Sequence, residues 1–406
     1  MNAESPVIDL DDVDLFARGG HLEAFEWLRE HDPVHRQESA DGGHRWALTR
    51  YDDVKWAYHH HELLGSSHGA IVGGSFGRRE DVAGNRMLVA SDLPRHRLLK
   101  RHIQPWMTTT VARRVAQLAD ELVSNAWDRL VSDGGGDIAE DVAPELPAAA
   151  LMVVMDVDHA EALKLISMTR RMVGFRDERW VNTGDDQGLR LAWLQMEIME
   201  FFADLVAVRR SRPGNDLVSH LLRAEVNGRR LSEDEVLYNC LNVAVGGNET
   251  TSHTACAGLS SLFSAPDQYE WLRSTKTVPD TAVDEMLRVA STNAYVQRVA
   301  RQDFEIGGAL VHEGDSLTLW NVSANHDDRR FDAPRVLNLT RSPNPHLSFG
   351  SGLHRCVGSP LARGELTSFF QVVASSPIQL RPTGPAQRLR SNFILGVPNL
   401  PVEVEG

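Results

Sequence analysis

The sequence predicts a mainly α-helical protein with a small β-rich part, folded as a single large domain over residues 1–406. Apolar residues recur at helical spacing through most of residues 95–263, with only short interruptions. Strand-like segments, rich in β-branched and aromatic residues, follow at Tyr295–Ala300 and residues 317–321. We find no linker, internal repeat or low-complexity tract, so a division into several domains is not favoured.

The composition restricts the function classes. A formal net charge of −14 disfavours a nucleic-acid partner. The sparse, odd set of cysteines (Cys240, Cys256 and Cys356) argues against a disulfide framework and for a reducing, cytoplasmic location. The first residues lack a basic head and an apolar run, and no window approaches about 18 uninterrupted apolar residues. We therefore expect neither a signal peptide nor a membrane span.

The expected elements follow in a simple order. An N-terminal tail of residues 1–20 lies within an irregular region that extends to residue 50 and includes a strand pair near residues 45–48. A helix over residues 52–63 precedes a glycine-rich loop over residues 64–91. The helical region ends with an unusually long helix over residues 232–263, and a shorter helix over residues 281–290 leads to the strands. A proline-punctuated run over residues 327–345 and a helix after Pro360 follow.

The long helix contains a feature that stability does not explain. Its start has a capping signature at Ser232, but Gly246 and Gly247 lie adjacent in its interior, where each glycine costs roughly 1 kcal/mol. Glu249, Thr250 and Thr251 follow directly. Small residues would let a ligand press against the helix, and a hydroxyl beside a carboxylate suits proton transfer. A close helix–helix crossing is the alternative explanation for the glycines.

A second unusual stretch lies at residues 346–363. Cys356 stands among glycines that include Gly352 and Gly358, and Ser359 and Pro360 predict an N-cap and a first helical position. A helix N-terminus favours an anion, and a thiolate is the form of cysteine that binds a metal. The alternative is an inert cysteine buried in a glycine-rich loop.

This stretch resembles the haem-binding loop of the cytochrome P-450 family, with Phe349, Gly352, His354, Cys356 and Gly358 at the family's fixed positions. The resemblance implies a cytochrome P-450 fold, haem b (iron protoporphyrin IX) as the cofactor and Cys356 as the iron ligand. The long helix is similar to the family's oxygen-activation motif, in which Gly246 and Gly247 approach the cofactor. There the resemblance implies a proton relay that consists of Glu249 and Thr250, with Thr251 adjacent.

Further segments match the family in order along the chain. The resemblance implies that the residues His96, Lys100, Arg298 and His354 anchor the haem propionates. Glu285 and Arg288 look like the family's structural ion pair. A third arginine often completes that pair in the family, but Val336 occupies its usual place. Arg335 or His326 is expected to substitute for it.

The resemblance implies a monomeric, bacterial-type monooxygenase that uses dioxygen and a small-molecule substrate. No flavin or iron–sulfur domain follows Cys356, so a separate ferredoxin and ferredoxin reductase are expected to supply electrons. The basic segment 95–114, which contains no acidic residue, is a candidate docking surface for the ferredoxin. A peroxide-driven haem peroxygenase and a non-enzymatic haem sensor are the alternatives. A hydrolase based on Cys356 and His354 is disfavoured, because at this spacing the two side chains diverge.

Amide and hydroxyl side chains mark the predicted substrate pocket. The family places the segment before the Arg298 strand in the pocket, and this chain has Thr292 and Asn293 there. Asn242 on the long helix, with Asn392 and Phe393 in the final turn, completes the predicted set. We therefore expect a medium-sized, secondary-metabolite-like substrate with neutral polar groups. The alternative is that these amides bond the backbone or one another.

Overall fold

The computed structural model describes residues 6–38, 43–72, 81–180 and 187–405. It confirms the predicted fold class, because helices form most of the structure and the strands form small sheets. The helices are α1 (Val13–Ala17), α2 (His21–His31), α3 (Tyr51–His59), α4 (Arg95–Ile103), α5 (Thr109–Ser132), α6 (Ile138–Asp141), α7 (Glu145–Met155), α8 (His159–Val173), α9 (Gln187–Ser211), α10 (Leu217–Arg223), α11 (Glu233–Phe263), α12 (Pro266–Ser274), α13 (Asp280–Ala290), α14 (Asn321–Asn325) and α15 (Ser359–Ser375).

The strands group into one larger sheet and three small ones. They are β1 (Val34–Glu38), β2 (His44–Leu48), β3 (Leu64–Gly65), β4 (Gly135–Asp137), β5 (Glu225–Val226), β6 (Arg229–Arg230), β7 (Tyr295–Ala300), β8 (Phe304–Ile306), β9 (Ala309–Val311), β10 (Ser316–Trp320), β11 (Leu380–Pro382) and β12 (Pro401–Val404). The five-stranded sheet has the order β1-β2-β10-β7-β3. Strand β10 runs parallel to β2 and antiparallel to β7, with Leu317 opposite both Trp46 and Arg298. This pairing fixes Arg298 in the middle of the sheet.

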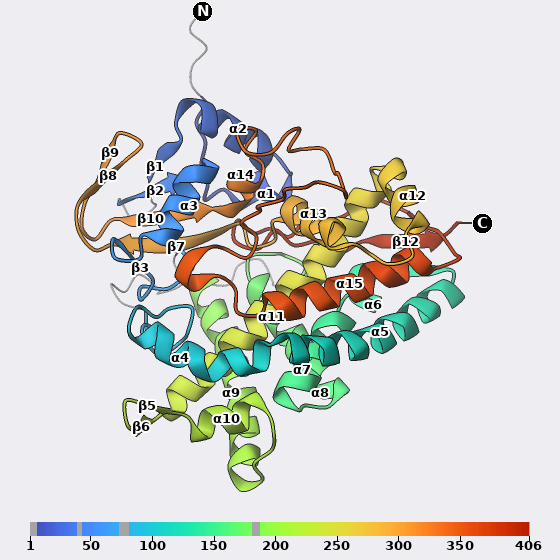
Figure 1. Cartoon of the computed structure of the whole chain (residues 1–406), viewed down its shortest axis with the longest axis horizontal. Helices are drawn as coiled ribbons and strands as arrows, with labels where there is room; N and C mark the ends of the chain where they lie inside the picture. Colours follow the sequence, from blue (N-terminus) through green and yellow to red (C-terminus); the bar gives the residue numbers. More distant parts are fainter. Residues whose placement is uncertain (1–5, 39–42, 73–80, 181–186, 406) are drawn as a thin grey trace, which may run out of the picture.

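Helix α11 runs diagonally through the molecule from the β5–β6 hairpin to α12 (Figure 1). A capping box starts it, because the Ser232 hydroxyl accepts from the Glu235 N–H and the Glu235 carboxylate accepts from the Ser232 N–H. Acidic residues in its first turn also suit the helix dipole. Its interior packs in one large apolar core with α5, α7, α8 and α15. The long helix is therefore held rigidly where it passes the centre of the protein.

The N-terminal region is more regular than the sequence indicated. The expected tail contains α1, whose Phe16 stacks on Trp320, and Leu10 is buried in the same cluster. Helix α2 lies in a region predicted to be irregular, and it packs on the sheet through Phe25. Part of the predicted loop 64–91, residues 73–80, lies outside the described residues. The spacing of apolar residues in the sequence did not predict these helices. The region has few apolar residues, and the residues they pack against lie far away in the chain, near residue 320.

The start of α15 also differs from the prediction. Gly358 is the N-cap, Ser359 is the first helical residue and no side chain caps the helix. The N–H groups of Gly358 and Ser359 therefore stay available to Cys356, which lies two residues before the N-cap.

Candidate active site

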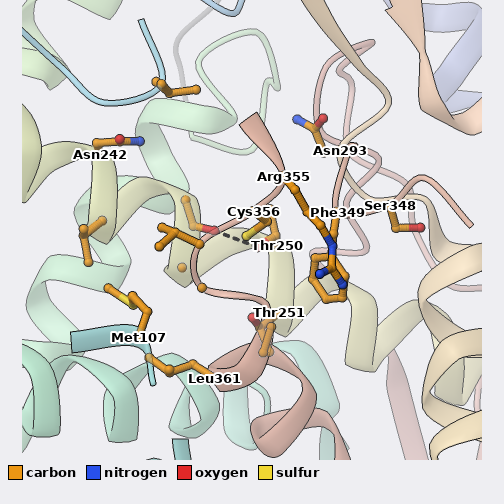
Figure 2. Close-up of a pocket in the computed structure, with 18 of the residues that line it drawn as sticks. Met107, Asn242, Thr250, Thr251, Asn293, Ser348, Phe349, Arg355, Cys356 and Leu361 are labelled. Carbon is orange, nitrogen blue, oxygen red and sulfur yellow. Dashed lines mark hydrogen bonds between the residues drawn. The ribbon is translucent and has the colours of Figure 1, made fainter. Parts of the chain in front are cut away.

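A cavity at the centre of the protein is lined by Cys356 and its loop, by α11, and by the segment between α13 and β7 (Figure 2). The loop turns tightly because Gly350 and Gly352 have φ values of +62° and +64°, which favour glycine. A Cβ on Gly352 would also lie 2.5 Å from the Tyr58 carbonyl oxygen. The Cys356 N–H donates to the Phe349 carbonyl at 2.9 Å, which closes the loop.

The Cys356 sulfur faces the cavity at the N-terminus of α15. Burial raises the pKa of the thiol, whereas the N–H groups of Gly358 and Ser359 and the charge of Arg355 oppose that rise. These groups stabilise the thiolate, which is the form that ligates iron. The N-terminus of α15 and the neighbouring cations therefore partly offset the cost of a buried thiolate.

A cluster of cationic and imidazole side chains lies at one side of the cavity. The His96 and His354 rings have centroids 4.2 Å apart, Lys100 donates to the Leu353 carbonyl at 3.2 Å, and Arg298 is buried. Burial, then the charge of Lys100, lowers the pKa of His96 to about 4. Burial and the charge of Arg298 lower the pKa of His354 to about 2.

This cluster has room for anions. Within the described ranges, no acidic side chain forms an ion pair with Lys100 or Arg298, and the buried Nδ1 of His96 has no hydrogen-bond partner. The charge of Asp92 acts on both His96 and Arg298, but its carboxylate is paired with Arg301 at 2.6 Å. A ligand that brings carboxylates would satisfy these donors.

The wall opposite the cysteine loop is formed by α11. A Cβ added to Gly246 or Gly247 would meet no atom within 4 Å, so packing against another helix does not explain these glycines. They instead leave a flat, open wall beside the cavity. Thr250 and Thr251 also line it, and the Thr250 hydroxyl donates to the Gly246 carbonyl at 2.8 Å.

Glu249 is directed to a different side of α11 from Thr250. Its carboxylate does not line the cavity and is buried against α8, where it accepts from the Thr169 hydroxyl at 3.0 Å. The Arg170 Nε and His253 Nε2 atoms lie 3.8 and 3.3 Å from its other oxygen. The sequence placed Glu249 beside Thr250 as a pair, but the structure does not direct the two side chains toward each other.

The predicted substrate residues divide into two groups. Asn242, Thr292 and Asn293 line the cavity. Asn392 and Phe393 do not, which corrects their predicted placement. The Asn392 amide donates to the Leu10 carbonyl at 2.9 Å, and the Phe393 ring packs edge-on against Tyr295. These contacts place Asn392 against the N-terminal segment and Phe393 against β7, away from the cavity.

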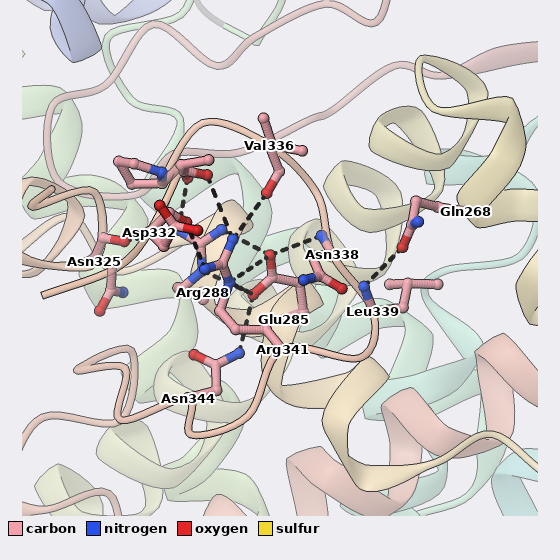
Figure 3. A network of polar contacts seen from close by, with 12 residues as sticks. Gln268, Glu285, Arg288, Asn325, Asp332, Val336, Asn338, Leu339, Arg341 and Asn344 are labelled. Atoms are coloured by element: carbon pink, nitrogen blue, oxygen red, sulfur yellow. Dashed lines mark hydrogen bonds and ion pairs between the residues drawn. The ribbon is translucent and has the colours of Figure 1, made fainter.

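Glu285 forms the predicted pair with Arg288 at 2.8 Å, and both side chains are fully buried (Figure 3). The third arm is Arg341, whose Nε lies 3.1 Å from Glu285, and neither expected substitute occupies this position. Arg335 pairs with the exposed side chains of Glu23 and Glu26, and His326 bonds the Val322 carbonyl. Arg341 also donates to the carbonyls of Asp332 and Val336 (2.7 and 3.2 Å), so it fixes the proline-punctuated segment on the α13 pair.

Sequence analysis missed Glu365, which also lines the cavity from α15. Burial raises the pKa of this carboxyl to about 8, and its Oε1 has no hydrogen-bond partner in the described parts of the chain. It is a neutral acid near pH 7. Only its four-residue spacing from Leu361, on the helix face toward the cavity, could have indicated it.

The chain matches the Cytochrome P450 family over residues 161–275 and 277–374. The chain belongs to this family and is a bacterial-type monooxygenase, an oxidoreductase. It is 31% identical over 398 residues to the steroid C26-monooxygenase of Mycolicibacterium smegmatis, which covers 95% of this chain and 91% of that relative.

Two solved structures are each 30% identical to the chain. One is P450 OxyD, involved in the biosynthesis of vancomycin-type antibiotics, with a TM-score of 0.88 over 98% of this chain and 100% of that one. The other is Mycobacterium marinum cytochrome P450 CYP268A2 in complex with pseudoionone, with a TM-score of 0.89 over 99% of this chain and 100% of that one. Within the described part of our chain, none of the helices combines the length and the apolarity needed to cross a bilayer.

The cofactor of the family is haem b, and the residues of this site fit it. Cys356 offers sulfur to an iron, and the glycine wall of α11 leaves room for a flat ring. The unpaired cationic cluster suits the two propionates of the porphyrin. Each part of the cofactor thus has a matching group among the cavity residues.

Proposed function

We propose that this protein oxidises a medium-sized, secondary-metabolite-like substrate that has neutral polar groups on an apolar frame. The single observation behind this proposal is the composition of the cavity wall. Asn242, Thr292 and Asn293 are set among apolar side chains of α7, α11 and α13, such as Leu151 and Val243. A ligand that covers these half-buried amides must hydrogen-bond them, because an unpaired buried amide costs roughly 1–3 kcal/mol.

The names of relatives agree with this substrate class. The relative from Mycolicibacterium smegmatis is a steroid C26-monooxygenase, and OxyD is involved in the biosynthesis of vancomycin-type antibiotics. Steroids and antibiotic precursors both combine an apolar frame with a few polar groups. A substrate of this kind would contact the wall of α11 and the segment that contains Asn293.

When bound, haem with a thiolate ligand activates dioxygen with two electrons and two protons. In our proposal Cys356 holds the iron, and the residues His96, Lys100, Arg298 and His354 orient the porphyrin through its carboxylates. The Thr250 hydroxyl lines the cavity beside the glycine wall, where it donates to the Gly246 carbonyl; turned toward the cavity, it would offer its proton there. Glu249 would contribute to the proton supply only from the other side of α11, where its carboxylate lies beside Arg170 and His253.

Electrons come from a separate ferredoxin and its reductase. On α4 and the start of α5, four exposed arginines have no ion-pair partner among the described residues: Arg97, Arg101, Arg113 and Arg114. Lys100 links α4 to the cysteine loop, so this surface lies on the side of the loop. A basic surface in a chain of net charge −14 suits a small acidic docking partner, and the protein itself would act as a monomer.

The test is turnover of candidate substrates with surrogate ferredoxin and reductase, after a screen of compounds by spectral shift. We expect oxygenated product that depends on both electron carriers. Product formed with peroxide alone would identify a peroxygenase instead. Binding without product under either condition would identify a haem sensor.

A further inference from the structure

Two asparagine side chains form a bonded pair on the cavity wall. Asn293 lies between α13 and β7, and Asn321 begins α14; both line the cavity. The Nδ2 of Asn321 lies 3.4 Å from the Asn293 carbonyl oxygen and 3.3 Å from the Asn293 Oδ1. Behind them, the Tyr58 hydroxyl donates to the Asn321 Oδ1 at 2.8 Å.

These partners determine which way each amide points. A backbone carbonyl only accepts hydrogen bonds, so the Asn321 atom that faces it must be the Nδ2. The Oδ1 of Asn321 then faces Tyr58, which is a suitable donor because burial raises the pKa of its hydroxyl and keeps it protonated. Since Nδ2 of Asn321 is a donor, the Asn293 atom beside it must be the acceptor Oδ1. The orientation of Asn293 is therefore set by Tyr58 through Asn321.

From this geometry we infer that Asn293 presents its Nδ2 donor to the cavity and selects substrates that carry a hydrogen-bond acceptor. No described residue accepts a hydrogen bond from this Nδ2, and in Figure 2 the nitrogen lies on the cavity side of the amide. The surrounding wall is largely apolar, so a substrate without an acceptor leaves the donor unsatisfied. The class is thus a ketone, ester or ether oxygen on an apolar frame.

This inference rests on the proposed function, because it assigns a ligand group to the same cavity. The inference predicts which substrate group is preferred. A ketone accepts a hydrogen bond and an isosteric alkene does not, so a fixed amide donor favours the ketone. A hydroxyl group can both donate and accept, so it is less sensitive to the orientation of the amide.

The experiment measures binding to the holoprotein with three rigid probes: 2-adamantanone, 2-adamantanol and 2-methyleneadamantane. Dissociation constants are determined by spectral titration and by calorimetry. The parent should bind the ketone about five- to tenfold more tightly than the alkene. In Asn293→Asp, which has the same shape but no donor, the ketone should lose this advantage and the alcohol should become the best ligand.

A second variant tests the orientation rather than the side chain itself. In Asn321→Asp the atom beside Asn293 becomes an acceptor, so Asn293 must rotate and present its Oδ1 to the cavity. The ketone preference should disappear although Asn293 is unchanged. Asn242→Leu is the matched control, because it removes another cavity amide without affecting the bonded pair, and it should keep the ketone preference.

The outcomes distinguish a failure of this inference from a failure of the proposed function. Equal ketone and alkene affinities in the parent would overturn the inference, and so would an unchanged ketone preference in Asn293→Asp. If the thiolate-haem spectrum is intact in these experiments, the proposed function is unaffected. Loss of haem from Asn293→Asp at parental expression also overturns it, because the amide would then serve the porphyrin. Absence of a thiolate-haem spectrum in the parent would instead be a failure of the proposed function.

Discussion

Replacing Arg341 by alanine should destabilise the protein by about 3 kcal/mol, whereas the same change at Arg335 should cost less than about 1 kcal/mol. Arg341 has a side chain only 9% exposed and contacts Glu285 through Nε at 3.1 and 3.2 Å. Removing one partner of a buried ion pair costs roughly 3–5 kcal/mol. We expect the lower end, because Glu285 keeps Arg288 and the Asn338 N–H.

Arg335 is the matched control because it lies in the same segment. Its side chain is 42% exposed, and its partners Glu23 and Glu26 are 65% and 62% exposed. Water and salt screen such pairs, so little free energy of unfolding depends on them. Arg341→Lys keeps the charge without the planar fork and should fall between the two.

The assay is urea unfolding of the holoprotein, followed by circular dichroism and by the Soret absorbance. Both probes should report a lower midpoint for Arg341→Ala, since the segment fixed by Arg341 leads into the cysteine loop. If Arg335→Ala costs as much as Arg341→Ala, or if the latter costs under 1 kcal/mol, the assignment of Arg341 as the third arm is refuted.

Three further predictions concern the cavity and its surroundings. Reduced protein with carbon monoxide should show the red-shifted Soret band of a thiolate haem, and Cys356→His should abolish that band while some haem remains bound; an unchanged band would contradict the assignment. Arg113→Glu should slow reduction by ferredoxin, most at low salt, whereas Arg230→Glu on the β5–β6 hairpin should not; a salt-independent rate that neither change alters would exclude the basic surface. The pKa of Glu365 is raised from 4.5 to about 8, so the folded state holds a proton that the unfolded chain releases, and stability should fall as pH rises between these values. Glu365→Gln should remove this loss, about 1.4 kcal/mol per pH unit, and identical pH profiles for variant and parent would show that the carboxyl is not buried and neutral.

The sequence was sufficient for features that depend on residues close together in the chain. The cysteine loop needs five residues within a short span, and the capping box of α11 needs only Ser232 and Glu235. Strand β7 was predicted at its observed bounds because its β-branched and aromatic residues are local. Such signals do not depend on how distant segments pack.

Features that depend on the path of the chain were missed. Nothing local distinguishes Arg341 from Arg335, because the folding of the proline-punctuated segment decides which arginine reaches Glu285, 56 residues away for Arg341. Asn392 and Phe393 were misplaced for a related reason. Leu10, 382 residues from Asn392 in sequence, provides its hydrogen-bond partner, and no periodicity reports such a contact.

The relation between Glu249 and Thr250 was accessible from the sequence, because consecutive residues of a helix point about 100° apart. Asn242, Gly246 and Thr250 recur every four residues and line the cavity, whereas Glu249 faces α8 and contacts His253, one turn further along α11. The two side chains should therefore fail differently when they are changed. The Thr250 hydroxyl bonds only its own helix among the described residues, so Thr250→Ala should leave stability within about 0.5 kcal/mol of the parent.

Glu249→Gln keeps the shape but removes the charge that faces Arg170 and His253, and it should lower the free energy of unfolding by about 1–3 kcal/mol. Both variants should keep the carbon-monoxide spectrum of a thiolate haem and release more peroxide per electron consumed, because each lacks one part of the proton supply. Urea unfolding and peroxide yield, measured on the same preparations, separate the two effects. Full coupling in Thr250→Ala would transfer the role to Thr251 or to ordered water. An unaltered stability in Glu249→Gln would mean that the contacts of this carboxylate with Arg170 and His253 do not stabilise the fold, and the supply of protons from that side would lose its basis.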